Sequence, residues 1–183
     1  KGIPKKNIID FCGKPLLAWT ILQLKLVNSL ADIWVSSDDE DILDIAERYG
    51  ARKILRPKEI SGDNATSESA WSHSVSYIED RVDNSVDYVL GPQVTSPLRE
   101  PKDFLEAIAK IQSSEADSLL SVVRIEDHFI WEGHSKGGYR PTNYDHRKRK
   151  LRQQIDSRFL ENGSFYLFTP ELLRQTRSRL GGE

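Results

Sequence analysis

The sequence predicts an α/β fold with a mostly parallel sheet. Short apolar runs, which are typical of strands, alternate along the chain with longer segments of helical periodicity. Proline, glycine and capping residues stand between these segments, where helices begin and end. The chain has 183 residues, a length that indicates a single domain covering residues 1–183.

The first half of the chain is expected to form helix, strand, helix, strand and helix. Pro15 suits the first turn of a helix that is apolar on most sides up to Val27. Ser37 and Glu40 have the spacing of a capping box, so a second helix should follow them and end at Gly50. The other expected elements are strands at 33–35 and 53–55, a loop at 56–66 and a helix around 71–78.

The second half continues this alternation. Pro101 opens a helix that should place Phe104, Leu105, Ile108 and Ile111 on one face. The other expected elements are strands at 86–90, 119–123 and 159–168, a loop at 91–97, an irregular or hairpin-like stretch at 126–143, and a last helix starting at Pro170. Ligands of such a sheet bind beyond the carboxyl ends of its strands, so the loops that follow the strands are where a site is expected.

Composition excludes several classes of protein. One cysteine cannot form a disulfide framework or a cysteine-based zinc site within one chain. With 26 Lys and Arg against 28 Asp and Glu, the net charge of −2 argues against a nucleic-acid partner. No apolar run approaches the ~18 residues that span a membrane, and no signal peptide is visible. The chain contains no Met and opens in what reads as the middle of a loop, so we expect it to be truncated at both ends.

The amino-terminal segment has the residue types that suit a polyphosphate. Residues 1–7 include three lysines, one glycine and one asparagine. A polyphosphate needs point positive charges and close approach of the backbone, and this segment offers both. It is not a P-loop, which ends in Gly-Lys-Ser/Thr. Taken alone, a solvated basic terminus is the more ordinary interpretation.

This segment and several later ones resemble, in the same order, the motifs of the CMP-sugar synthetases, the cytidylyltransferases for sialic acids and related nonulosonic acids. The matching segments are Lys1–Asn7, Cys12–Leu16, Val35–Asp39, Arg56–Ile60, Asp63–Ser67, Gln93–Arg99, Arg152–Gln154 and Glu161–Tyr166. Each motif alone is weak, but their order over nearly the whole chain is specific. The resemblance implies a Rossmann-like three-layer fold of the nucleotide-diphospho-sugar transferase type, with a β-rich dimerisation arm at about 126–158.

The resemblance also implies a reaction and a set of site residues. In this reaction the anomeric hydroxyl of an acidic nine-carbon sugar attacks the α-phosphorus of CTP, and pyrophosphate leaves. Catalysis of this type rests on positioning and charge neutralisation. The implied enzyme is a cytoplasmic homodimer that binds neither nucleic acid nor membrane. By motif position, the implied catalytic residues are Lys1 and Lys6, the nucleotide-binding residues are Gly2, Asn7, Arg56 and Ser67, and the sugar-binding residues are Gln93, Thr95, Ser96, Arg152, Arg158 and Asn162.

Several of these residues have other interpretations. Arg56 could pair with a surface acid, and Ser67 could cap the helix that follows it. Thr95 and Ser96 could hold a turn. Without the ordered set of motifs, these local roles would be the more ordinary ones, since polar loop residues usually bond nearby backbone.

The resemblance implies Mg²⁺ as a cofactor, which the family holds partly with an Asp-x-Asp pair near the carboxyl end. This sequence stops before any such pair, so no metal ligand is assigned. Asp38 and Asp39 are adjacent, and their expected task is to cap the next helix and interact with its dipole. If the polypeptide is only this long, we expect weak or no catalysis.

Two basic features in the late part of the chain depend on the resemblance. Many relatives have an arginine where Leu160 stands, and residues two apart on a strand share a face, so Arg158 is expected to supply that guanidinium to the sugar carboxylate. Alternatively, Arg158 is one more exposed basic residue.

The run His146–Arg152 could bind nucleic acid, act as a localisation signal, form a solvated loop or attract anionic substrates. We favour a place in the arm, reaching a neighbour's active site.

Two other functions remain open at this point. The nearest enzyme is a cytidylyltransferase for 3-deoxy-manno-octulosonate, although the late Arg-Gln and Asn-Gly-Ser pattern fits the sialic-type group better. The alternative from another class is a non-catalytic nucleotide- or polyanion-binding module. A polyanion binder should lose affinity steeply as salt rises, whereas a site that reads cytosine should keep its base preference.

Overall fold

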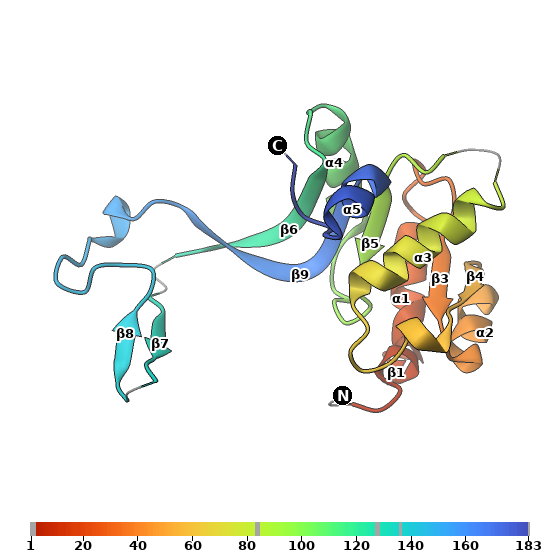
Figure 1. Ribbon diagram of the computed structural model, residues 1–183, viewed down its shortest axis with the longest axis horizontal. Helices are drawn as coiled ribbons and strands as arrows, with labels where there is room; N and C mark the ends of the chain where they lie inside the picture. The colour runs from red at the N-terminus through yellow and green to blue at the C-terminus, as the bar shows by residue number, and fades with distance from the viewer. Residues whose placement is uncertain (1–2, 83–84, 127–128, 136, 183) are drawn as a thin grey trace. The chain divides into compact units, whose positions relative to one another are not determined.

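The computed structural model describes residues 3–82, 85–126, 129–135 and 137–182, and it confirms the alternation of helices and strands (Figure 1). The α-helices are α1 (Leu16–Leu24), α2 (Glu40–Arg48), α3 (Ser67–Glu79), α4 (Pro101–Gln112) and α5 (Pro170–Thr176). The strands are β1 (Asp10–Phe11), β2 (Lys14–Pro15), β3 (Trp34–Ser37), β4 (Arg52–Leu55), β5 (Val89–Pro92), β6 (Ser118–Ile125), β7 (Trp131–Gly133), β8 (Tyr139–Pro141) and β9 (Arg158–Phe168). The short 3₁₀ helices within the described residues are η1 (Lys6–Ile8), η2 (Lys58–Ile60) and η3 (Arg152–Gln154).

The chain divides into two compact units. Unit 1 consists of Lys1–Ser121 and Gly163–Glu183, and unit 2 is Val122–Asn162. The arm expected at about 126–158 falls inside unit 2, where β7 and β8 form an antiparallel hairpin. The expectation of an irregular or hairpin-like stretch is therefore confirmed for the described residues, while a role of this unit in dimerisation stays a prediction.

The strands of unit 1 pair in both directions. β3 and β4 are parallel, in a register that runs from Trp34↔Arg52 to Ser37↔Leu55. A second sheet has the order β5-β9-β6, and its central strand β9 runs antiparallel to β5. The expectation of a mostly parallel sheet thus holds for β3 and β4 and is wrong for β9. The physical reason is connectivity, because β9 follows the long inserted segment and not the crossover helix that usually joins two parallel strands.

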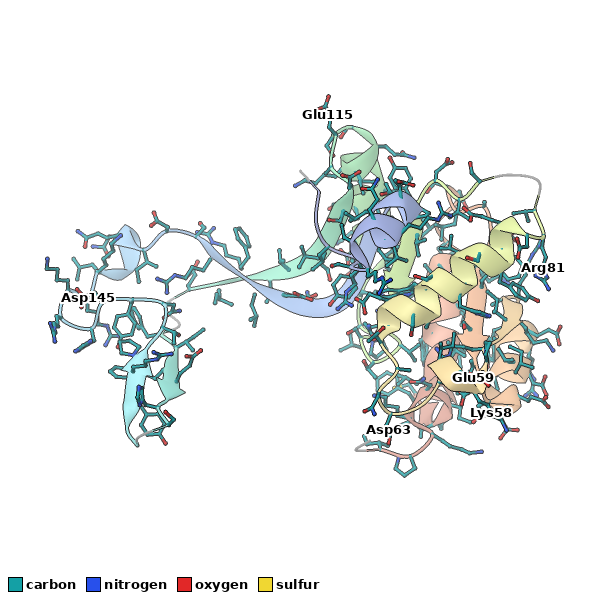
Figure 2. All side chains as sticks on the ribbon, in the orientation of Figure 1. Lys58, Glu59, Asp63, Arg81, Glu115 and Asp145 are labelled. Carbon is teal, nitrogen blue, oxygen red and sulfur yellow. The ribbon has the colours of Figure 1, made fainter. Side chains whose placement is uncertain are left out.

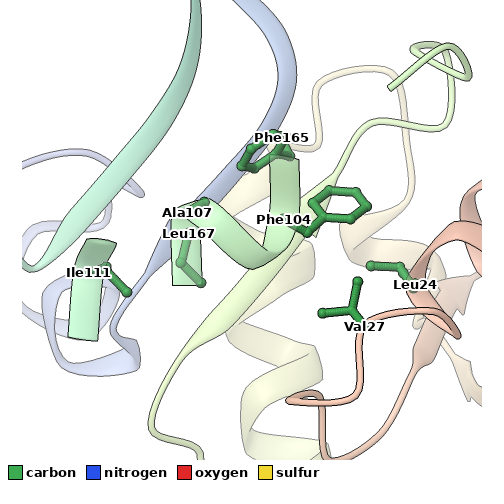
Figure 3. Close-up of a cluster of buried hydrophobic side chains, with 7 residues drawn as sticks. All are labelled: Leu24, Val27, Phe104, Ala107, Ile111, Phe165 and Leu167. Carbon is green, nitrogen blue, oxygen red and sulfur yellow. The ribbon is translucent and has the colours of Figure 1, made fainter. Parts of the chain in front are cut away.

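The core of unit 1 forms where helices cover the strands. Phe104 of α4 is fully buried, and its ring lies 5.0 Å from that of Phe165 on β9 in an edge-to-face arrangement (Figure 3). Ile111 is 1% exposed on the same face of α4, as expected, but Leu105 is 43% exposed and does not belong to it. Ala107 takes the intervening core position, because residues three and four apart share a helix face.

Pro101 and Pro170 begin helices as expected, whereas Pro15 ends β2 and precedes the first residue of α1. The capping box predicted from Ser37 is not observed. Pro101 begins α4, where Glu100 and Asp103 form a reciprocal capping box. At α2, however, Ser37 is the last residue of β3, and the cap is Asp39, whose Oδ1 accepts from the backbone N–H of Asp41 at 2.9 Å. Within the described residues, no helix is long and apolar enough to cross a bilayer.

Candidate functional site

The parallel strands β3 and β4 bring two loops to one edge of the sheet, and Arg56 lies there. Its backbone N–H donates to the carbonyl oxygen of Ser37 at 2.9 Å. Its Nε donates to Ser61 Oγ at 3.0 Å, and its Nη2 lies 3.5 Å from Asp38 Oδ1. The guanidinium is half-buried and held from both sides, so this cationic group has a defined position at the carboxyl ends of the strands.

The amino-terminal segment reaches the same edge through the first turn of α2. Lys5 Nζ donates to Asp41 Oδ2 at 2.8 Å, and this contact raises the pKa of Lys5 and lowers the pKa of Asp41. Lys6 and Asn7 follow directly in η1, which contacts both α1 and α2. The expected phosphate-binding Lys6 therefore lies exposed near the start of α2. Lys1, expected to act with Lys6, and Gly2, expected to bind the nucleotide, lie outside the described residues.

The segment between β4 and α3 is short and largely exposed, and it carries Lys58, Glu59 and Asp63 (Figure 2). Ser67, expected at the nucleotide, is the exposed first residue of α3. The capping role considered for Ser67 belongs instead to Thr66, whose Oγ1 accepts from the backbone N–H of Ser69 at 3.1 Å. The Ser67 side chain is consequently not the helix cap.

The loop after β5 carries the residues expected to face the sugar. The backbone N–H of Gln93 donates to Ser164 O at 2.8 Å, and that of Ser96 donates to Gln93 O at 3.1 Å. The loop is therefore a turn, as considered for Thr95 and Ser96, and the Thr95 side chain is exposed at its tip. Val94 packs against the cluster that includes Leu17, which places this loop beside α1.

Arg99 organises this loop and was missed by the sequence reasoning. It is 8% exposed, and its Nη1 donates to the carbonyl oxygens of Gln93 and Ser96 at 2.8 Å and of Ser164 at 3.1 Å, while Nη2 donates to Thr20 Oγ1 at 2.8 Å. Burial lowers the pKa of Arg99 to about 10, so the group stays charged at neutral pH. Arg99 ends the matched Gln93–Arg99 segment, which was the available signal, but arginines are rarely this buried and were not expected to be internal.

A second side chain from α1 supports the same loop. Gln23 Nε2 donates to Pro97 O at 2.6 Å and to Arg99 O at 2.9 Å. Together with Thr20, it anchors the residues that follow the turn, Pro97 and Arg99, on α1. The backbone that presents Gln93, Thr95 and Ser96 is thus held by buried polar contacts, which is how a binding loop is kept in one conformation.

The remaining expected sugar-binding residues belong to unit 2. Arg158 is half-buried, and its Nη2 donates to Asn143 O at 2.6 Å. Leu160 follows two residues later on β9 and is 52% exposed. Asn162 is exposed at the end of this unit, and Arg152 begins η3. The contact with Asn143 shows that Arg158 is tied to its own unit and is more than a solvated surface charge.

The described residues contain no cluster of three or more metal-ligating side chains. Among them, no three His, Cys, Asp or Glu side chains come close enough together to hold a metal ion. The two adjacent aspartates have other contacts, since Asp39 caps α2 and Asp38 lies beside Arg56. No step of the chemistry is therefore assigned to a metal held by these residues.

The known proteins that are similar in sequence to this chain include several cytidylyltransferases. The chain is 36% identical to N-acylneuraminate cytidylyltransferase of Oncorhynchus mykiss, over 92% of this chain and 38% of that protein. It is 37% identical to N-acylneuraminate cytidylyltransferase A of Danio rerio, over 96% and 40%. Pseudaminic acid cytidylyltransferase of Campylobacter jejuni is 29% identical over 92% of this chain and 73% of its own. The chain thus spans about two fifths of the length of the first two relatives.

The fold agrees with solved structures at lower identity. A CMP:2-keto-3-deoxy-manno-octonic acid synthetase complexed with CTP matches with a TM-score of 0.69 at 15% identity, over 99% of this chain and 73% of that one. A 4-diphosphocytidyl-2C-methyl-D-erythritol synthase matches with a TM-score of 0.69 at 12% identity, over 97% and 77%. The family profile described as Cytidylyltransferase matches residues 1–166. With nearly the whole chain covered by that match, the protein belongs to the cytidylyltransferase family.

Proposed function

We propose that this protein joins CTP to a free nonulosonic acid of the sialic type, forming the CMP-activated sugar with release of pyrophosphate. The observation that supports this most strongly is the sequence similarity, at 29–37% identity, to cytidylyltransferases named for N-acylneuraminate and for pseudaminic acid. The defined positions of Arg56 and of the Gln93–Ser96 loop beyond the strands agree with it.

The residues of unit 1 are assigned to the two substrates. Lys6, with Lys1, neutralises phosphate charge, and Gly2 and Asn7 lie along the nucleotide. Arg56 and Ser67 line the cytidine side, where the half-buried Arg56 guanidinium has a defined place. Gln93, Thr95 and Ser96 face the sugar from the turn that Arg99 holds.

The reaction itself needs little covalent chemistry from the protein. The anomeric oxygen forms a bond to the α-phosphorus, the bond from that phosphorus to the bridging oxygen breaks, and pyrophosphate carries away the electron pair. The hydroxyl proton passes to solvent or to a nearby base. Lysine and arginine groups lower the barrier by neutralising charge that develops on the phosphate oxygens, and a rigid loop keeps the attacking hydroxyl in line.

Unit 2 is proposed as the arm of a homodimer, with Arg152, Arg158 and Asn162 serving the sugar. This small unit exposes many large apolar side chains, as a surface that packs against another chain does. They are Val122, Val123, Ile130, Trp131, Tyr139, Leu151, Phe159 and Leu160, each at least 44% exposed. Sedimentation equilibrium is expected to show a dimer at micromolar concentration, and a monomer there would contradict the assignment.

Replacing Arg158 with alanine is expected to raise the KM for the sugar far more than the KM for CTP. A guanidinium that pairs with the sugar carboxylate makes charge-assisted hydrogen bonds that alanine cannot replace, and CTP does not use this contact. The matched control is Arg140→Ala, which removes an exposed arginine of the same unit that lies 3.6 Å from Glu132. Equal effects on both KM values would contradict the assignment of Arg158 to the sugar.

Two alternative functions can be distinguished from the proposed one, the first by the sugar substrate that is used and the second by the effect of salt on binding. The structural match to a CMP:2-keto-3-deoxy-manno-octonic acid synthetase favours the eight-carbon acid as a second candidate substrate. Pyrophosphate release measured with each free acid and CTP decides this, and we expect turnover with the nine-carbon acids.

The exposed basic run at 146–151 favours a second alternative, a surface that binds polyanions without catalysis. In that case affinity for any polyphosphate would fall steeply with salt and show no base preference.

A further inference from the structure

Arg179 lies three residues beyond the end of α5, and its side chain is held against the start of α3. Its Nη1 donates to Glu68 Oε1 at 2.5 Å, and both side chains are 24% exposed. Partial burial reduces competition from water, so a charge-assisted pair of this kind keeps its geometry better than an exposed ion pair. The pair joins two segments that are 111 residues apart in the sequence.

Two aromatic rings fix the same guanidinium. Its Cζ lies 4.1 Å from the ring centroid of Tyr166 on β9 and 5.3 Å from that of Trp71 on α3. Contacts of a cation with aromatic faces are strongest where water is excluded, and Tyr166 is 4% exposed. Trp71 is itself close to the backbone of β5, because a Cβ on Gly91 would lie 3.1 Å from Trp71 Cζ2. Arg179 therefore connects α3, β9 and the segment after α5.

Glu68 is the second residue of α3, directly after Ser67. A contact that fixes the Glu68 side chain also fixes the first turn of the helix and the residues that enter it. The loop 61–66 before this turn starts at Ser61, which accepts from Arg56 Nε. The ends of this loop are thus restrained by Arg56 on one side and by Glu68 with Arg179 on the other.

The other end of α3 carries a similar ion pair that offers a comparison. Arg174 Nη2 lies 2.5 Å from Oε2 of Glu79, the last residue of α3. Arg174 belongs to α5 and is 50% exposed, against 24% for Arg179. The two pairs join the same part of the chain to the same helix, but only Arg179 acts at the end that leads into Ser67.

We propose that Arg179 is a positioning residue for the nucleotide: through Glu68 it holds the first turn of α3 and the loop 61–66 in the conformation that binds CTP. This inference rests on the proposed function for its nucleotide part. The ordering of residues 61–72 is a separate consequence that can be measured without any ligand.

The test compares Arg179→Ala with Arg174→Ala in two measurements. Hydrogen exchange of the ligand-free chain reports the order of residues 61–72, and calorimetry with Mg²⁺ present gives the Kd for CTP. We expect Arg179→Ala to speed exchange in this segment and to raise the Kd about tenfold, because misplaced binding groups cost affinity steeply. Arg174→Ala should leave both within about twofold, as expected for an exposed ion pair.

Two further variants cover the case in which Arg179→Ala does not fold. Arg179→Lys keeps the charge without the planar fork, and Glu68→Gln keeps the shape of the acceptor without its charge, so both should show part of the effect. Equal exchange and equal Kd values in the Arg179 and Arg174 variants would overturn the inference. A wild-type chain that binds no CTP would remove the proposed function and the nucleotide part together, while faster exchange in Arg179→Ala alone would still establish the ordering role.

Discussion

Replacing Arg99 with alanine is expected to destabilise the fold by roughly 3 kcal/mol, since hydrogen bonds to charged groups contribute about 1.5–3 kcal/mol each and do not add fully. The buried guanidinium donates to three backbone carbonyls and to Thr20, and alanine would leave a cavity and lost partners in their place. For a chain of this size, the corresponding fall in Tm is about 6–12 °C. Thermal unfolding followed by circular dichroism measures it.

Two variants sharpen this result. Arg99→Lys keeps the charge but cannot reach several acceptors in one plane, so it should recover only part of the stability. Lys102→Ala is the matched control, because Lys102 is exposed and pairs with Glu100 at the surface, and its loss should leave the Tm unchanged. If Arg99→Ala had the same Tm as the wild type, this would contradict the account of how the Gln93–Ser96 turn is held.

Replacing Arg56 with alanine is expected to raise the Kd for CTP roughly ten- to a hundredfold, which corresponds to the loss of one charge-assisted contact of about 1.5–3 kcal/mol. The Arg56 guanidinium is held at the carboxyl ends of β3 and β4 by Ser61 and Asp38, so under the proposed function it needs no further ordering to contact the nucleotide. Isothermal titration of CTP into the variant gives the change directly.

The control for Arg56 removes the same charge from β4, the strand that leads into Arg56. Lys53 lies on β4 and pairs with Glu47 and Asp44 of α2, so Lys53→Ala changes the net charge equally without touching the loop edge. It should bind CTP within about twofold of the wild type, because an exposed ion pair contributes little. If both variants lost affinity equally, general electrostatic attraction rather than a specific contact would explain the binding.

Local patterns predicted the elements of unit 1 well, and long-range pairing poorly. The prolines at 101 and 170 begin α4 and α5, and the apolar runs lie on the observed strands. Periodicity describes one segment at a time, so it could not show that β9 would enter the sheet antiparallel to β5. Asp39 caps α2, as expected for the adjacent aspartates, whereas the capping box expected from Ser37 is wrong because β3 continues through Ser37.

In the candidate site, too, the sequence predicted local features well and long-range contacts poorly. The motif order predicted the loops that carry Arg56 and Gln93, and these loops follow β4 and β5 as expected. Arg99 and Arg179 were missed because their importance comes from partners far along the chain, Thr20 in one case and Glu68 in the other. A sequence shows the charge of an arginine, but only the fold shows which carbonyls or rings surround it.

The measurement that tests the central claim most directly is calorimetric binding of CTP compared with UTP and ATP, with Mg²⁺ present and at two salt concentrations. A site that hydrogen-bonds the cytosine edge strongly rejects a base that leaves its polar groups unpaired. We therefore expect CTP to bind at least about tenfold more tightly than either competitor, with the preference retained at high salt. Equal affinity for the three nucleotides, falling steeply together as salt rises, would contradict the proposed function and identify a polyanion-binding surface instead.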